Sequence, residues 1–142
     1  MYGDKMEIPE GEYMIPIGVA DIKREGSDVT VVSFGKIIKE AYKAAEALEK
    51  EGISIEIIDL RTVRPMDHAA IVASVKKTNR LVILEEAWPF GSVASEITFR
   101  IQDEAFDYLD APIKRITTAD TPAPYSPVLL EAWLPNLSLI HI

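Results

Sequence analysis

The chain contains no cysteine, which excludes disulfide bonds and thiolate metal sites. It has no apolar run near the roughly 18–20 residues that a membrane-spanning helix needs, and its polar, acidic start lacks the pattern of a secretory signal. Positive charge is scarce, since 15 basic residues face 23 acidic ones and the net charge is −8. This balance argues against nucleic-acid binding, which needs clustered lysine and arginine.

The common catalytic and phosphate-binding motifs are missing as well. The chain has no Gly-x-Gly-x-x-Gly and no Gly-x-x-x-x-Gly-Lys-Ser/Thr, so nothing marks a dinucleotide or nucleoside-triphosphate site. Gly-x-Ser-x-Gly, the nucleophile turn of many hydrolases, is absent. His68 and His141 do not have metal-ligand spacing. We therefore assign no catalytic, cofactor-binding or metal-ligating residue.

What the sequence does contain is a regular alternation of strand and helix patterns. Short β-branched and apolar runs predict strands at 29–34, 53–60, 80–85 and 113–117, with an edge strand within 17–24. Apolar residues at helical spacing predict helices at 36–51, 67–77, 91–104 and 127–133. In 142 residues, this alternation predicts one α/β domain with a mostly parallel sheet and helices on both faces. Residues 1–16 show neither period and are predicted to be an interdomain linker.

The loop after the second long strand is the most distinctive segment. It carries Arg61 and Arg64, followed by Pro65, which stiffens the turn, and by Asp67, where a helix is expected to begin. The carboxyl ends of parallel strands are where α/β sheets place working or docking surfaces. We therefore consider the two arginines as candidates for such a surface.

A second candidate follows the strand at 80–85. Glu85 and Glu86 are adjacent, so on a strand they point to opposite faces and cannot form one acid/base dyad. In one interpretation one glutamate is solvated and the other is paired, with Arg61 or Arg64. In the other, the acidic and aromatic loop that contains Trp88 lies at a subunit or domain interface. The residues alone leave both open.

Several motifs then occur in a fixed order along the chain. They are Ile15-Pro16-Ile17-Gly18, residues 26–33, residues 59–67, Trp88-Pro89-Phe90-Gly91, residues 95–97, residues 106–112 and Pro122-Ala123-Pro124-Tyr125. In this order they closely resemble the C-terminal domain of the beta subunit of thiamine-dependent 2-oxo acid dehydrogenases. The wording Arg64-Pro65-Met66-Asp67 is more similar to pyruvate dehydrogenase than to the branched-chain enzyme.

The resemblance implies a three-layer α/β/α fold with a five-stranded, mostly parallel sheet, similar to the transketolase C-terminal domain, over residues 17–136. It implies thiamine diphosphate and magnesium in the full enzyme, held between the alpha subunit and the N-terminal domain of beta. Neither group is expected in this fragment, which we expect to be inactive alone. The complete pyruvate dehydrogenase would decarboxylate pyruvate and transfer an acetyl group to lipoyl groups.

The resemblance also implies partners. These are the dehydrogenase alpha subunit, a second beta subunit and the subunit-binding domain of the dihydrolipoyl acyltransferase. Asp110 would dock the acyltransferase, although an aspartate shortly before a proline is also a common turn former. Arg61, Arg64, Glu85, Glu86 and Trp88 are then expected at a subunit interface or in structural ion pairs. We expect a cytoplasmic, bacterial protein with no membrane or nucleic-acid partner.

Residues 137–142 read as the translation of a transposon end sequence used in library preparation, and we expect them to be a non-native tail. A fragment without its other domains should expose apolar surface, which favours a non-native homodimer. The alternatives are a free-standing interaction or regulatory module, the same domain of a branched-chain or acetoin dehydrogenase, and an independent enzyme that uses Glu85, Glu86 and the arginines.

Overall fold

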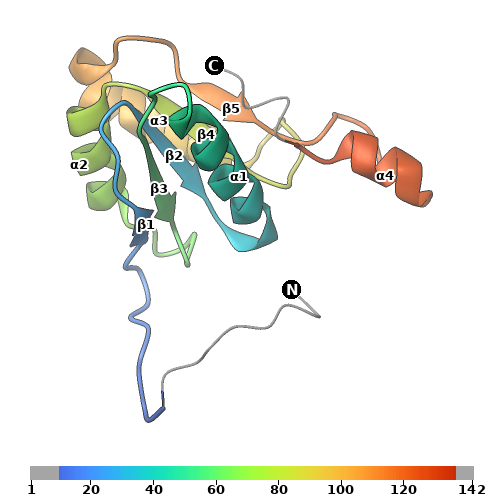
Figure 1. Ribbon diagram of the computed structural model, residues 1–142, viewed down its shortest axis with the longest axis horizontal. Coiled ribbons are helices and arrows are strands. Elements are labelled where there is room, and N and C mark those ends of the chain that lie inside the picture. Colours follow the sequence, from blue (N-terminus) through green and yellow to red (C-terminus); the bar gives the residue numbers. More distant parts are fainter. Residues whose placement is uncertain (1–9, 137–142) are drawn as a thin grey trace.

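The computed structural model describes residues 10–136, which form one sheet with helices on both of its faces (Figure 1). Residues 10–16 contain neither helix nor strand and are exposed. The tail expected at 137–142, with His141, lies outside the described residues, and so do the first nine residues of the expected linker.

The sheet has five strands in the order β1-β3-β2-β4-β5. Their bounds are β1 (Asp21–Arg24), β2 (Val29–Ser33), β3 (Ile55–Asp59), β4 (Leu81–Leu84) and β5 (Lys114–Ile116). β1 runs antiparallel to β3, and the other neighbours are parallel. All residues of β2 and β4 are buried, as expected for parallel strands covered on both faces. The predicted mostly parallel, five-stranded sheet is confirmed.

Within residues 10–136, four α-helices and two short 3₁₀ turns connect and flank the strands. They are η1 (Gly35–Ile37), α1 (Ile38–Glu49), α2 (His68–Thr78), α3 (Val93–Ala105), η2 (Phe106–Tyr108) and α4 (Pro127–Trp133). In Figure 1, α1 covers one face of the sheet, α2 and α3 cover the other, and α4 lies apart at one end. All predicted helices are present; the bounds of α4 are as predicted, and the ends of the other three are shifted by one or two residues.

The core is divided into two layers by the sheet. On one side, the alanines of α1 pack against one set of strand side chains, and their small size allows helix and sheet to approach closely. On the other side, Ile71 and Val75 of α2 and Ile97 and Ile101 of α3 pack against the alternate strand side chains. Because side chains alternate along a strand, neighbouring residues of β2, β3 and β4 supply opposite layers.

Two element boundaries differ from the expectation for physical reasons. β1 begins at Asp21, because the preceding residues bond to the loop after β3 instead of to a strand. The Gly18 N–H donates to Thr62 Oγ1 at 3.0 Å and the Ala20 N–H to Asp67 Oδ2 at 3.0 Å. The helix expected at 36–51 begins with the 3₁₀ turn η1, and such turns are common at the start of helices. The first residue of η1, Gly35, has a left-handed backbone (φ 71°), which glycine adopts without strain.

Candidate functional site

Arg61 lies in the loop after β3 and braces the edge of the sheet. Its Nη2 donates to Asp21 Oδ2 at 2.5 Å, and its own N–H donates to Asp59 Oδ1 at 3.0 Å. Asp21 also pairs with Lys23 at 2.5 Å. The hydrogen bond from Lys23, and next the charges of Lys23 and Arg61, lower the pKa of Asp21 against the effect of its partial burial.

The predicted pairing of Arg61 or Arg64 with Glu85 or Glu86 is wrong. The reason is the strand order: β1 is the neighbour of β3, whereas β4, which carries the glutamates, is separated from β3 by β2. Asp21 is the register partner of Asp59, so it is within reach of Arg61 two residues later.

Arg64 has no ion-pair partner in the described part of the chain. It lines an open hollow of about 740 Å³ between the β3–α2 loop and α3, together with His68 and Arg100. Arg100 Nε donates to Glu96 Oε1 at 2.7 Å across one turn of α3. Glu96 also lines the hollow, so Arg64 is the arginine there whose charge is not balanced by a described partner.

The two glutamates after β4 have opposite environments, as their adjacency predicts. Glu85 is fully buried, and its Oε2 accepts a hydrogen bond from the Ala94 N–H at 3.2 Å, so it caps the start of α3. Glu85 Oε1 and Ser92 Oγ are buried without a hydrogen-bond partner among the described residues. Glu86 is exposed and lines a second hollow, of about 570 Å³, between α1 and α4.

The aromatic loop after Glu86 is held in place by the segment that follows β5. Trp88 Nε1 donates to the Thr121 carbonyl at 2.9 Å, and Trp133 Nε1 of α4 donates to the same carbonyl at 3.0 Å. Arg115 Nη1 donates to the Pro89 carbonyl at 3.2 Å. Phe90, at the tip, is 91% exposed. The loop is therefore a braced surface that presents an aromatic side chain to solvent.

Asp110 is exposed on the loop between α3 and β5. Its N–H donates to the Asn79 carbonyl at 2.9 Å, and Asn79 Nδ2 donates to the Tyr108 carbonyl at 2.7 Å. The loop therefore rests on the end of α2. The sequence reasoning missed Asn79, although an asparagine directly after a helical pattern is a known helix-ending signal.

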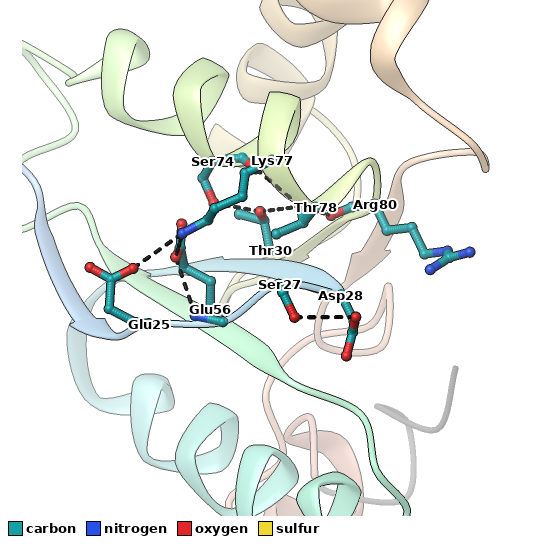
Figure 2. Close-up of polar contacts among 10 residues, drawn as sticks. Glu25, Ser27, Asp28, Thr30, Glu56, Ser74, Lys77, Thr78 and Arg80 are labelled. Atoms are coloured by element: carbon teal, nitrogen blue, oxygen red, sulfur yellow. Dashed lines mark hydrogen bonds and ion pairs between the residues drawn. The ribbon is translucent and has the colours of Figure 1, made fainter.

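A buried polar cluster between the sheet and α2 was also missed (Figure 2). Thr30 Oγ1 of β2 lies 2.5 Å from Ser74 Oγ and 2.7 Å from Thr78 Oγ1, both on α2. The three hydroxyl groups satisfy one another in a site with no access to water. The cluster ties helix and sheet together at the amino ends of the parallel strands.

Beside this cluster, Glu56 of β3 is 1% exposed yet charged (Figure 2). It pairs with Lys77, which also contacts Glu25 at 3.1 Å, and it accepts from the Gly26 N–H at 3.3 Å. Burial alone would raise the pKa of Glu56, but the hydrogen bonds from Lys77, Ser74 and Gly26 outweigh it and lower the pKa. The bond to Glu56, in turn, raises the pKa of Lys77. A single glutamate inside an isoleucine-rich strand is the signal that could have revealed this pair.

Gly26 approaches the sheet so closely that no other residue fits. A Cβ at this position would lie 2.2 Å from the backbone of Ile55 and Glu56. The missing side chain lets the Gly26 N–H reach Glu56, so this glycine is part of the pair's support.

No helix within residues 10–136 is long and apolar enough to span a bilayer. In the same residues, no three histidine, cysteine, aspartate or glutamate side chains are arranged to hold a metal ion. The described residues therefore do not fit the magnesium that the resemblance implies for the full enzyme, and we derive no chemical step through that cofactor.

The strand order, the two helical layers and the loops at the carboxyl edge define a three-layer α/β/α domain. The chain belongs to the family described as "Transketolase, C-terminal domain", whose model matches residues 18–140. The family predicted from the ordered motifs is confirmed.

Two relatives are identical to this chain at about half of the matched positions. It is 51% identical over 135 residues to the acetoin:2,6-dichlorophenolindophenol oxidoreductase subunit beta of Bacillus subtilis (strain 168). That match covers 95% of this chain and 40% of the relative. It is 50% identical over 139 residues to the pyruvate dehydrogenase E1 component subunit beta of Rhizobium meliloti (strain 1021). This second match covers 97% of this chain and 30% of the relative. The chain thus spans less than half the length of these relatives.

A solved structure is similar as well. It is titled "Split gene transketolase, inactive beta4 tetramer", superposes with a TM-score of 0.78 and is 25% identical. The match covers 94% of this chain and 42% of that one. It confirms the transketolase C-terminal-like fold.

Proposed function

We propose that this chain is the C-terminal assembly domain of the beta subunit of a thiamine-dependent 2-oxo acid dehydrogenase of the pyruvate dehydrogenase type. The observation that carries the proposal is the identity of 50% with a pyruvate dehydrogenase beta subunit over 97% of the chain. In the complete enzyme, thiamine diphosphate and magnesium would be held outside these residues and would support decarboxylation of pyruvate and acetylation of lipoyl groups. The proposal includes a cytoplasmic location in a bacterium, as the resemblance implies.

The first role we propose for the domain is to hold subunits together. Phe90, Tyr125, Val128 and Leu129 are between 59% and 103% exposed, and they belong to the aromatic loop and to the segment containing α4. Trp88 and Trp133 join these two parts through one carbonyl, so the apolar side chains have a fixed support. Aromatic side chains on a rigid support are typical of interface centres. The alpha subunit or the second beta subunit would cover them.

The second role we propose is docking of the acyltransferase through Asp110. The carboxylate is exposed, and the surrounding segment adds the exposed Asp103, Glu104 and Asp107. A basic residue on the subunit-binding domain of the acyltransferase would pair with Asp110. Such a pair at the rim of an interface mainly sets the orientation and the association rate.

Substitution of Asp110 by arginine tests the docking role. We expect Asp110→Arg to weaken binding of a purified acyltransferase subunit-binding domain by at least about tenfold, as a reversed charge faces the basic partner. Binding is measured by biolayer interferometry at two salt concentrations. Glu46→Arg, an equal charge change at an exposed position of α1, is the matched control and should bind normally. Equal binding by the two variants would contradict the docking role.

The relative from Bacillus subtilis supports a second candidate, a beta subunit that acts on acetoin. The two candidates differ in the substrate of the complete enzyme and not in the role of this domain. Reconstitution of the full-length beta subunit with its alpha subunit, followed by assays with pyruvate and with acetoin, separates them. Turnover of acetoin without turnover of pyruvate would replace the leading proposal.

A further inference from the structure

We propose that Asn79, at the end of α2, is a positioning residue that holds the Asp110 loop in the orientation required for docking. The inference rests on the docking role proposed above and extends it to a residue about thirty positions earlier in the chain. It concerns how the carboxylate is presented and not a new contact with the partner.

Asn79 combines three hydrogen bonds at one point. It ends α2 in the left-handed region (φ 60°, ψ 4°), where its N–H donates to the Val75 carbonyl at 2.8 Å. Its carbonyl accepts from the Asp110 N–H at 2.9 Å, and its side-chain Nδ2 donates to the Tyr108 carbonyl at 2.7 Å. One residue thus binds the docking loop on both sides of Leu109.

Other contacts of the same loop support this clamp. The ammonium group of Lys76, on the last turn of α2, lies 4.9 Å from the centre of the Tyr108 ring. The Leu109 N–H donates to the Phe106 carbonyl at 3.0 Å, which closes the turn η2, and the Leu109 side chain packs against the core. The loop is therefore fixed to α2 before any partner arrives.

The chemistry of asparagine explains why this residue suits the position. The left-handed backbone favours glycine or asparagine, and only asparagine also supplies an amide donor for the Tyr108 carbonyl. Glycine would keep the backbone conformation without the donor. Aspartate would keep the size but would place an acceptor against that carbonyl. Asn79 therefore satisfies the helix end and the loop together.

A clamped loop matters for docking because ordering a loop on binding lowers affinity. If the loop is already ordered, the charge of Asp110 acts from a fixed place. Loss of the Asn79 side-chain bond should therefore weaken binding without removing any atom of the interface. A net hydrogen-bond contribution of ordinary size corresponds to a loss of about three- to tenfold in Kd.

The test uses the whole chain with the substitutions Asn79→Gly, Asn79→Asp and Asp110→Asn, and the double variant N79G/D110N. Binding of the acyltransferase subunit-binding domain is measured by biolayer interferometry, and unfolding in urea shows that each variant is folded. We expect N79G and N79D to bind about three- to tenfold more weakly than the unaltered chain. We also expect faster amide hydrogen exchange at Asp110 in N79G, because the side-chain bond that anchors the nearby Tyr108 carbonyl is lost and the loop opens more often.

The double variant separates positioning from a general structural effect. If Asn79 acts through Asp110, N79G should change the affinity much less in the D110N background than in the unaltered chain. The inference is overturned if N79G binds as well as the unaltered chain, if its effect persists in full beside D110N, or if N79D restores binding. Should D110N itself bind normally, or the unaltered chain not bind at all, the docking role fails first and the inference falls with it.

Discussion

At the scale of single residues, the buried charge of Glu56 is compensated by a partner of opposite charge. Glu56 is nearly inaccessible to water, and a buried carboxylate without a partner would be strongly unfavourable. Lys77 supplies the opposite charge and remains 44% exposed, so only one end of the pair is desolvated. This asymmetry limits the pair's contribution to stability, because the exposed end is screened by solvent.

The pair predicts how stability depends on pH. The pKa of Glu56 is lower in the folded chain than its ordinary value, so the stabilisation is present above that ordinary value and is lost as the pH falls through the folded pKa. The pKa of Lys77 is raised, so its share is present below the ordinary lysine value and is lost only as the pH rises through the raised pKa. Urea unfolding between about pH 7 and pH 3 should show a decline to which Glu56 contributes.

Glu56→Gln should flatten that decline and reduce the free energy of unfolding at pH 7 by about 1–2 kcal/mol, because Lys77 then faces a neutral group. Glu46→Gln, at an exposed site on α1, serves as the control and should follow the unaltered chain. A pH dependence that is identical in all three proteins would show that Glu56 is not linked to folding.

At the scale of elements, the positions of the strands and helices could be predicted from the sequence, whereas the turns that lead into them could not. The β-branched runs and the helical periods located every strand and helix to within a few residues, since each period is local in sequence. The late start of β1 was not predicted, because it depends on contacts with the loop after β3. The two 3₁₀ turns were not predicted either.

Asp67 illustrates how one side chain can serve two elements. Its Oδ1 accepts from the Ala70 N–H at 3.1 Å and caps α2, while its Oδ2 accepts from the Ala20 N–H at 3.0 Å and holds the entry to β1. We expect Asp67→Ala to lower the free energy of unfolding by about 1–3 kcal/mol, since both bonds are lost. Asp67→Asn keeps a single carbonyl acceptor, so its free energy of unfolding should lie between those of the unaltered chain and Asp67→Ala.

Urea denaturation with the same probe for all three proteins measures this difference. Hydrogen exchange adds a local readout, since the amide groups of Ala20 and Ala70 should both exchange faster in the alanine variant. If only the Ala70 amide responds, Asp67 is a helix cap and does not link the two elements.

At the scale of the whole molecule, one group of exposed apolar side chains lies on the aromatic loop and on α4. Phe90 is 91% exposed, Val128 75% and Leu129 59%, next to a segment stiffened by prolines. Side chains of this kind in a single domain usually mark a protein interface. This is the surface that the proposed subunit contacts would cover.

In the absence of other subunits, we expect this surface to pair with a second copy of the chain. Light scattering over a range of concentrations should detect a dimer that dissociates on dilution. The double substitution Phe90→Ser and Leu129→Ser should shift the equilibrium to monomer, whereas Phe99→Ser, at a 69% exposed position on α3, should not. A monomer at every concentration would contradict the expectation.

The sequence by itself determined the alternation of strands and helices, the α/β class and the family, because these follow from local periods and ordered motifs. Only the tertiary structure decided the order β1-β3-β2-β4-β5, and with it the partner of each charged side chain. Arg61 pairs with Asp21, and Glu85 caps α3, because contacts between distant segments depend on which strands become neighbours. The same reason applies to Asn79, which gains its connection to Asp110 only when α2 and the loop before β5 meet.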